Sequence, residues 1–142
     1  FSGQVILTIT TSNISKPHMA QHNDFGKWGE DLAVHYLSEK GYAILERDWR
    51  YGHKDIDIIA ISDDTLVFVE VKTRRNDTFM RPEQSVDWKK IKNITLAANH
   101  YVKMNGIDLQ IRFDIISIVA KGTDGKCSID HIESAFLPYY FR

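Results

Sequence analysis

Apolar residues recur in this chain at steps of three and four between residues 25 and 40, and again between residues 84 and 104. This spacing is the period of an α-helix with one buried side. Asp24 stands where a helix N-cap is expected, and Gly41 follows the first run where a helix would end. The pattern therefore predicts two amphipathic helices, one over residues 25–40 and the other over residues 84–104.

Other apolar segments are short, rich in Ile, Val and Phe, and bounded by Gly, Asp and Ser residues, which is typical of β-strands. The predicted strands span residues 42–46, 56–61, 66–72, 111–119 and 128–133. The order of elements is α-β-β-β-α-β-β. A long helix between two strands indicates a crossover, so we expect an α/β fold whose central mixed sheet has helices on both faces.

Residues 1–18 have a different character, because they are rich in Thr, Ser and Ile and carry Lys16 as their charged residue. Their apolar run is too short for a secretion signal, and no basic segment precedes it. Met19 is therefore the expected natural start, which makes residues 1–18 a leader and residues 19–142 a single domain. The alternative is an edge strand, since residues 5–11 are largely β-branched.

The overall composition is that of an ordinary globular domain, with 142 residues, 43% of them hydrophobic and 26% charged. A chain of this length suits one domain and buries a sizeable core without disulfides. The single cysteine, Cys127, cannot form an internal bridge and fits a reducing compartment. Since no apolar run approaches the roughly 20 residues that cross a bilayer, we expect a cytoplasmic protein without a membrane partner.

The most informative polar residues lie on the second and third predicted strands. Side chains alternate between the two faces of a strand, so Asp55 shares a face with Asp57, as Glu70 does with Lys72. If residues 63–64 form a two-residue hairpin loop, Asp57 lies opposite Glu70. The same register places Asp55 opposite Lys72, and a bulge in either strand would break it.

Two carboxylates that face each other between apolar strands repel, and a divalent cation removes that repulsion. Asp57 and Glu70 are therefore candidate ligands of Mg²⁺ or Mn²⁺, with the Val71 carbonyl oxygen as a further ligand. Glu30 borders the buried side of the first helix and is a candidate third carboxylate. Such an ion polarises a phosphate oxygen and activates water, while Lys72 would orient that water or neutralise charge on the phosphate. The predicted chemistry is phosphodiester hydrolysis.

A local basic segment follows this acidic motif, although the whole chain has a net charge of −1. Residues 72–92 contain seven Lys or Arg and three Asp or Glu residues, which gives a local balance of +4. Basic side chains of this kind bind the phosphate backbone of nucleic acids. The candidate contacts are Arg74, Arg75, Arg81, Lys89 and Lys90. The alternative is a solvated surface that binds no ligand.

Structural interpretations stand beside the functional ones. The acidic pair with its lysine could be a salt-bridge cluster, and the carboxylate of the first helix could be an ordinary helix-edge residue. Asp114 lies in an apolar strand, which favours a buried hydrogen-bonding role. Trp28, Trp49 and Tyr51 are able to stack on nucleic-acid bases, but packing in or beside the core is favoured. His53 precedes the acidic motif and is within reach of a phosphate.

Several segments, read together, are similar to a known family. They are residues 26–30, 36–37, 41–45, 55–60, 67–72 and 112–114. These motifs resemble the bacterial YraN-like family within the PD-(D/E)XK nuclease superfamily, over roughly residues 23–119.

This resemblance implies a restriction-endonuclease-like core of α-β-β-β-α-β order and a relation to the archaeal Holliday-junction resolvases. It also places four residues in the metal and catalytic positions, namely Glu30, Asp57, Glu70 and Lys72. Many members of the family have Glu where this chain has the shorter Asp55.

The leading hypothesis is a Mg²⁺- or Mn²⁺-dependent endodeoxyribonuclease that acts on branched or otherwise structured DNA, with RNA left open as a substrate. The first alternative is a nucleic-acid-binding module of the same fold with little or no cleavage activity. The second is an interaction subunit whose old site has lost its function, and the intact acidic motif argues against it. A homodimer is expected by analogy with the resolvases, which cut two strands.

Overall fold

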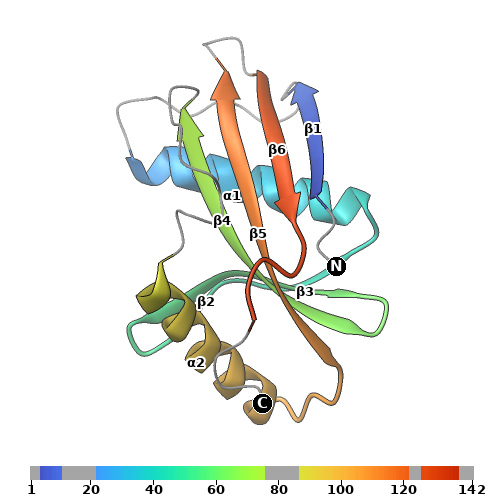
Figure 1. Cartoon of the computed structure of the whole chain (residues 1–142), viewed down its shortest axis with the longest axis vertical. Helices are drawn as coiled ribbons and strands as arrows, with labels where there is room; N and C mark the ends of the chain where they lie inside the picture. Colours follow the sequence, from blue (N-terminus) through green and yellow to red (C-terminus); the bar gives the residue numbers. More distant parts are fainter. Residues whose placement is uncertain (1–3, 11–21, 76–86, 122–125, 138–142) are drawn as a thin grey trace.

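The computed structural model describes residues 4–10, 22–75, 87–121 and 126–137, with the side chains of residues 4–10, 22 and 23 left out. Its elements, labelled in Figure 1, are β1 (Gln4–Thr10), α1 (His22–Glu39), β2 (Ala43–Tyr51), β3 (Lys54–Ser62), β4 (Thr65–Arg75), α2 (Trp88–Met104), β5 (Gln110–Lys121) and β6 (Lys126–Ile132). From α1 onward, this is the predicted order α-β-β-β-α-β-β.

The strands form a six-stranded sheet in the order β1-β6-β5-β4-β3-β2. β4 and β5 are parallel neighbours and the other neighbouring pairs are antiparallel, so the sheet is mixed as expected. A parallel pair needs a crossover connection, and α2 lies in that connection (Figure 1). The chain therefore has the α-β-β-β-α-β order of a restriction-endonuclease-like core, extended at one edge by β6 and β1.

The two helices cover opposite faces of this sheet, as predicted (Figure 1). Val67 and Val69 of β4 pack in the core cluster that contains residues of α1. The alternate residues, Leu66 and Phe68, pack in the cluster that contains residues of α2. The sheet is thus buried on both sides along β4. Among the described residues, no helix is long and apolar enough to span a membrane.

The strand predicted over residues 42–46 is longer in the structure, where β2 continues to Tyr51. β2 is an edge strand with many exposed side chains, and its pairing with β3 shifts between Ile44 and Glu46. An edge strand is partly solvated, so its sequence carries fewer apolar residues than a central strand. Hydrophobic periodicity therefore finds only the first half of β2.

The start of α1 differs from the prediction, and the predicted start of the second helix cannot be compared directly with α2. α1 begins at His22, so Asp24 lies in its first turn instead of at its cap. The start predicted for the second helix, residue 84, lies outside the described residues. As described, α2 follows its N-cap Asp87, whose side chain accepts a hydrogen bond from the Lys90 N–H at 2.8 Å.

Residues 4–10 form the outer strand β1, which pairs antiparallel with β6. The register runs from Gln4 opposite Ile132 to Thr10 opposite Lys126. An edge strand was one of the two interpretations of the N-terminal segment, and its β-branched residues suit that position.

Candidate active site

The β3–β4 hairpin has the predicted register. From the loop at residues 63–64, the strands pair residue by residue as far as Ile58 opposite Val69. The pairing stops there, one position before Asp57 and Glu70 would face each other. The two acidic residues therefore stand where the strands of the hairpin part.

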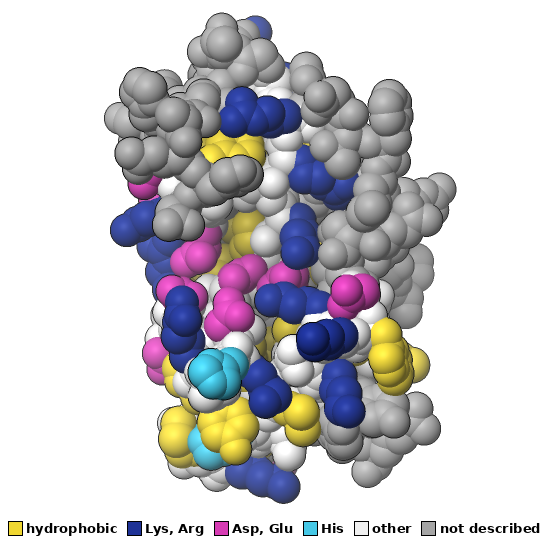
Figure 2. Space-filling view, turned by 90° about the vertical axis from the view of Figure 1, so that its left-hand side faces the viewer, with side chains coloured by type: hydrophobic (Ala, Val, Ile, Leu, Met, Phe, Trp, Pro, Cys, Tyr) yellow, Lys and Arg dark blue, Asp and Glu magenta, His cyan; other side chains and the backbone are white. Residues whose placement is uncertain are grey.

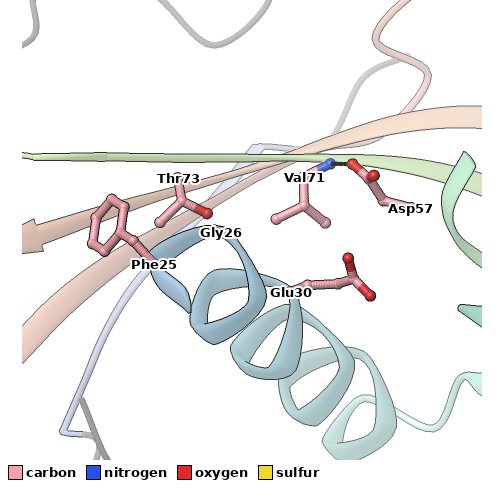
Figure 3. Close-up of a pocket in the computed structure, with 6 residues that line it drawn as sticks. All are labelled: Phe25, Gly26, Glu30, Asp57, Val71 and Thr73. Carbon is pink, nitrogen blue, oxygen red and sulfur yellow. Dashed lines mark hydrogen bonds between the residues drawn. The ribbon is translucent and has the colours of Figure 1, made fainter. Parts of the chain in front are cut away.

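Both β2 and β3 are irregular beside Asp57. On β3, Ile56 packs in the α2-side core and Ile58 in the α1-side core, although residues two apart normally share a face. On β2, Asp48 has a φ of +48° and lies between the residues that pair with these two isoleucines. Asp57 is thereby directed at β4, where its Oδ2 accepts a hydrogen bond from the Val71 N–H at 2.8 Å (Figure 3).

A pocket of about 330 Å³ opens beside this hydrogen bond. Its lining comes from α1, β3 and β4 and consists of Phe25, Gly26, Glu30, Asp57, Val71 and Thr73. Figure 3 shows Glu30 on α1 and Asp57 on β3 with their carboxylates on the same side of the pocket. The structure therefore brings together three of the predicted site residues, Glu30, Asp57 and Val71.

Gly29 sets the distance between α1 and β4 at this pocket. It is buried, and a Cβ built on it would overlap the hydroxyl group of Thr73. A larger residue at position 29 would push the helix away from the strand. Sequence reasoning did not single out Gly29 or Thr73, because the need for a close approach arises only when the two elements pack.

Glu70 is the most deeply buried carboxylate of the site, with 4% of its surface exposed. Its Oε2 lies 3.5 Å from the Lys72 Nζ and 3.6 Å from the Lys90 Nζ. Its other oxygen, Oε1, is buried and has no hydrogen-bond partner among the described residues. A buried carboxylate oxygen without a partner is costly, so this atom indicates a place for a ligand.

The ionised form of Asp57 is disfavoured by its surroundings. Burial, and then the negative charge of Glu70, raise the pKa of Asp57 well above its usual range, and the hydrogen bond from Val71 only partly opposes them. The two carboxylates are thus close enough to repel, as the sequence predicted. A positive charge placed between them would relieve this repulsion.

Glu30 occupies a more open position. Burial raises its pKa, and Arg47 opposes that shift; the Arg47 Nη2 lies 3.4 Å from the Glu30 Oε1. Arg47 also bonds Asp31 on the same helix. Glu30 therefore lines the pocket as an ion-paired carboxylate. Within the described ranges, no group of three or more His, Cys, Asp or Glu side chains is arranged to hold a metal ion.

Glu70 does not line this pocket, and its neighbour Lys90 comes from α2, on the other side of the sheet from α1. Asp57 links the two places, because it lines the pocket and its charge is repelled by that of Glu70. Asp57 and the Glu70 Oε1, which has no partner among the described residues, offer carboxylate oxygens, the ligands that Mg²⁺ and Mn²⁺ prefer. Mg²⁺ is typically held by one or two carboxylates together with water and phosphate oxygens. Two carboxylates are therefore within the usual number of acidic ligands for Mg²⁺.

The predicted pair of Asp55 and Lys72 is not what the structure shows. Lys72 lies beside Glu70, and Asp55 instead has its Oδ1 3.8 Å from the Lys90 Nζ. Because the pairing of β3 and β4 ends at Ile58, Asp55 has no cross-strand neighbour on β4 in that ladder. Lys90 from α2 instead lies within 4 Å of both Asp55 on β3 and Glu70 on β4.

Lys90 was predicted as a phosphate contact and lies at the acidic site. Burial lowers its pKa, but the charges of Glu70 and Asp55 outweigh burial and raise the pKa above its ordinary value. The lysine is therefore charged at neutral pH. Sequence alone could not place it here, since the docking of α2 on the sheet is a tertiary contact.

The remaining basic candidates lie in different surroundings. The Arg74 Nη2 donates a hydrogen bond to the Ser117 Oγ at 3.3 Å, and the Arg75 guanidinium lies 5.2 Å from the centroid of the Phe25 ring. Lys89 is exposed, and Arg81 lies outside the described residues. On the face shown in Figure 2, Asp and Glu side chains gather near the middle, with Lys and Arg side chains around them.

Two of the other residues considered in the sequence, Trp28 and Asp114, have structural roles in the core. Trp28 is buried and stacks on Phe25, as favoured by the sequence. Asp114 is fully buried and accepts hydrogen bonds from Arg112 and from the Ser134 N–H, and its Oδ2 lies 2.8 Å from the His131 Nε2. Its predicted hydrogen-bonding role is confirmed.

Fold and site together define an α/β protein with a restriction-endonuclease-like core and a pair of repelling carboxylates at the open end of a central hairpin. The chain belongs to the family described as "Uncharacterised protein family UPF0102", whose model matches residues 29–118. This is the YraN-like family that the motifs resembled.

Similar proteins occur in several bacteria. A UPF0102 protein of Bacteroides thetaiotaomicron is 50% identical over 123 residues, which cover 87% of this chain and all of that protein. A UPF0102 protein of Flavobacterium psychrophilum is 48% identical over 123 residues, with the same coverage. A third, from Parabacteroides distasonis, is 48% identical over 118 residues, which cover 83% of this chain and 96% of that protein.

Proposed function

We propose that this protein is a cytoplasmic, Mg²⁺- or Mn²⁺-dependent endonuclease that hydrolyses phosphodiester bonds in branched or structured DNA. The observation that carries the proposal is the buried Glu70, whose Oε1 has no described partner and whose charge raises the pKa of Asp57. A fully satisfied salt-bridge cluster would give every carboxylate oxygen a partner, whereas here the lysines lie at the Glu70 Oε2 and the Oε1 has no partner among the described residues. The preference for branched DNA rests on the resemblance to the resolvases.

Each side chain then has a defined task. Asp57 and Glu70 would hold the ion, which when bound would polarise a phosphate oxygen and make a water more acidic. The Lys72 ammonium, on the same strand as Glu70, stabilises negative charge that builds on the phosphate as the bond breaks. Glu30 faces the pocket with a raised pKa, which suits it to exchange a proton with water.

The basic side chains around the carboxylates supply binding (Figure 2). Arg74 and Arg75 continue β4 beyond Lys72, and Lys89 is exposed at the start of α2. Phosphate contacts of this kind hold a nucleic acid without reading its sequence. A homodimer would bring two such sites to the two DNA strands of a branched substrate.

One observation favours binding without cleavage. Glu70 is neutralised through its Oε2 by two lysines, Lys72 and Lys90, and no three-carboxylate group is formed by the described residues. A site of this kind could retain nucleic acid and bind metal too weakly for catalysis. The alternative function is therefore a nucleic-acid-binding module of nuclease fold.

The test is incubation with labelled duplex, single-stranded, flap and four-way DNA, and with RNA, in Mg²⁺, Mn²⁺ or EDTA. Wild type should cleave at least one DNA substrate with metal and none in EDTA. Glu70→Gln should abolish cleavage, while Glu39→Gln, at an exposed site on α1, should not. Cleavage that resists EDTA, or that survives Glu70→Gln, would overturn the proposal, and binding without cleavage would support the alternative.

Lys72→Ala separates chemistry from binding. A stabiliser of transition-state charge contributes little to ground-state affinity, so cleavage should fall by about 10²-fold or more. Calorimetric Mn²⁺ binding should persist, because lysine is not a ligand. A variant that cleaves at the wild-type rate would remove Lys72 from the mechanism.

A further inference from the structure

A stack of aromatic rings joins the end of β2 to α2. The Tyr51 and His100 rings are parallel within 14°, with centroids 3.9 Å apart. Trp49 lies beyond them, 6.2 Å from His100 and edge-on to the buried Tyr101 at 5.1 Å. The inner rings fix the stack to the core, whereas 41% of the surface of Tyr51 is exposed.

The exposed ring is held on a rigid element. Tyr51 pairs with Lys54 across the β2–β3 turn, in which Gly52 has a φ of +63°. Among the described residues, His100 is the sole aromatic partner of Tyr51. One side of the ring is thus packed and preorganised, while the residue remains open to solvent. This arrangement suits stacking by a further planar group.

Along the chain of β3, the stack is a few residues from Asp57, although it lies on the side of the sheet that α2 covers and the pocket lies against α1. Lys54, opposite Tyr51, precedes Asp57 by three residues on β3, which corresponds to about 10 Å at roughly 3.3 Å per residue. This is the axial length of about three stacked nucleotides at 3.4 Å each. A strand with a phosphate at Asp57 could therefore place one of its nearby bases on Tyr51.

The surrounding charges favour a nucleic acid over an apolar partner. Lys54 is paired with Tyr51 in the β2–β3 ladder. Lys103 lies three residues after His100 on α2, so the two residues are neighbours on the helix surface. Nearby Asp48 is paired with Arg50 at 3.7 Å. In Figure 2, hydrophobic and His side chains lie on the same face as the carboxylates, with Lys and Arg side chains next to them.

We propose that the Tyr51–His100 stack is a binding site for an unpaired nucleobase of the strand that occupies the acidic pocket. The inference rests on the proposed function for its nucleic-acid ligand. Paired bases in a duplex are stacked on one another and do not offer a free face, whereas single-stranded segments do. The site therefore selects substrates that contain an unpaired segment, such as flaps, single-stranded ends and opened junctions.

The test measures binding instead of cleavage. Fluorescence anisotropy in EDTA compares a dye-labelled oligo-dT with a blunt duplex of the same length. Tyr51→Ala should weaken oligo-dT binding about 5- to 150-fold, the scale of one stacked base, and change duplex binding by less than about twofold. Tyr51→Phe keeps the ring and should bind as wild type, while Tyr51→Leu keeps apolar bulk without a π-face and should resemble Tyr51→Ala.

Equal losses for both probes, no loss with Tyr51→Ala, or no binding of oligo-dT by wild type would each overturn the base site. Wild-type behaviour of Tyr51→Leu would do so too, because it would indicate an apolar surface for another kind of partner. The failure of the proposed function is distinguishable. Tyr51-dependent oligo-dT binding in a protein that never cleaves would support the base site and leave only the nuclease reaction refuted.

Discussion

Replacement of Asp57 by asparagine should stabilise the protein in the absence of metal. Asparagine has nearly the same shape, and its Oδ1 can still accept the hydrogen bond from the Val71 N–H. The substitution removes a buried negative charge that is repelled by Glu70. A residue retained in the wild type at a cost to stability is expected at a functional site.

The size of the gain follows from elementary electrostatics. Two like charges at about 5 Å repel by about 1 kcal/mol in water and about 3 kcal/mol at an effective dielectric constant of about 20. Lys72 and Lys90 beside Glu70 reduce this repulsion, and the bond from Val71 to a neutral acceptor is weaker by about 1 kcal/mol. Asp57→Asn should therefore raise the free energy of unfolding by about 1–2 kcal/mol at pH 8.

The stability gained by Asp57→Asn should be larger at high pH than at low pH. The folded-state pKa of Asp57 lies above its unfolded value, so the folded protein binds more protons between these two values. The contribution of Asp57 to the stability of the metal-free wild type consequently falls as pH rises from about 4 through the folded pKa and is then constant. Asparagine does not titrate, and the advantage of Asp57→Asn should shrink as pH is lowered toward 4.

Urea unfolding in EDTA and in Mn²⁺ provides the measurement. At about 100 times its Kd, Mn²⁺ should stabilise wild type by about 2.7 kcal/mol and the variant much less, so the order of stabilities reverses. Asp55→Asn, on the same strand beside Lys90, is the matched control and should change stability by less than about 1 kcal/mol. If Asp57→Asn is less stable than wild type in EDTA at pH 8, Asp57 is a structural acceptor and the electrostatic reasoning fails.

Two further predictions concern packing and the buried polar network. Gly29→Ala should lower stability by about 1–3 kcal/mol in thermal unfolding, because the added Cβ overlaps Thr73. Adding Thr73→Ala to this variant should recover part of the loss. The control is Gly26→Ala, which has open space around its Cβ and should not be destabilising. An unchanged Tm for Gly29→Ala would show that α1 can move without cost. Asp114→Asn should cost about 3–5 kcal/mol in urea unfolding, since it removes the buried carboxylate that contacts both Arg112 and His131, while Arg112 keeps its ion pair with Glu133. Asp64→Asn in the exposed hairpin loop should be nearly neutral. A loss under about 1 kcal/mol for Asp114→Asn would contradict a stabilising network.

The order of helices and strands was predictable from the sequence because it depends on local periodicity. A helix that packs on a sheet needs an apolar residue every three to four positions, and a two-residue loop fixes the register of the strands it joins. The hairpin from Ile58 to Val69 therefore has the predicted pairs. The exposed second half of β2 escaped prediction, because solvent on one side of an edge strand relaxes the demand for apolar residues.

The sequence predicted that Asp57 and Glu70 lie close together, since they come one position after Ile58 and Val69, the last residues paired in the hairpin. The geometry of the site was decided only by tertiary structure. The irregularity at Asp48 and Asp57 turns one carboxylate toward β4. The docking of α2 brings Lys90 to Glu70 and also to Asp55, where Lys72 was the expected neighbour. These contacts depend on how separate elements pack, and the packing energy that selects them is summed over the whole core, so no local spacing in the sequence encodes them.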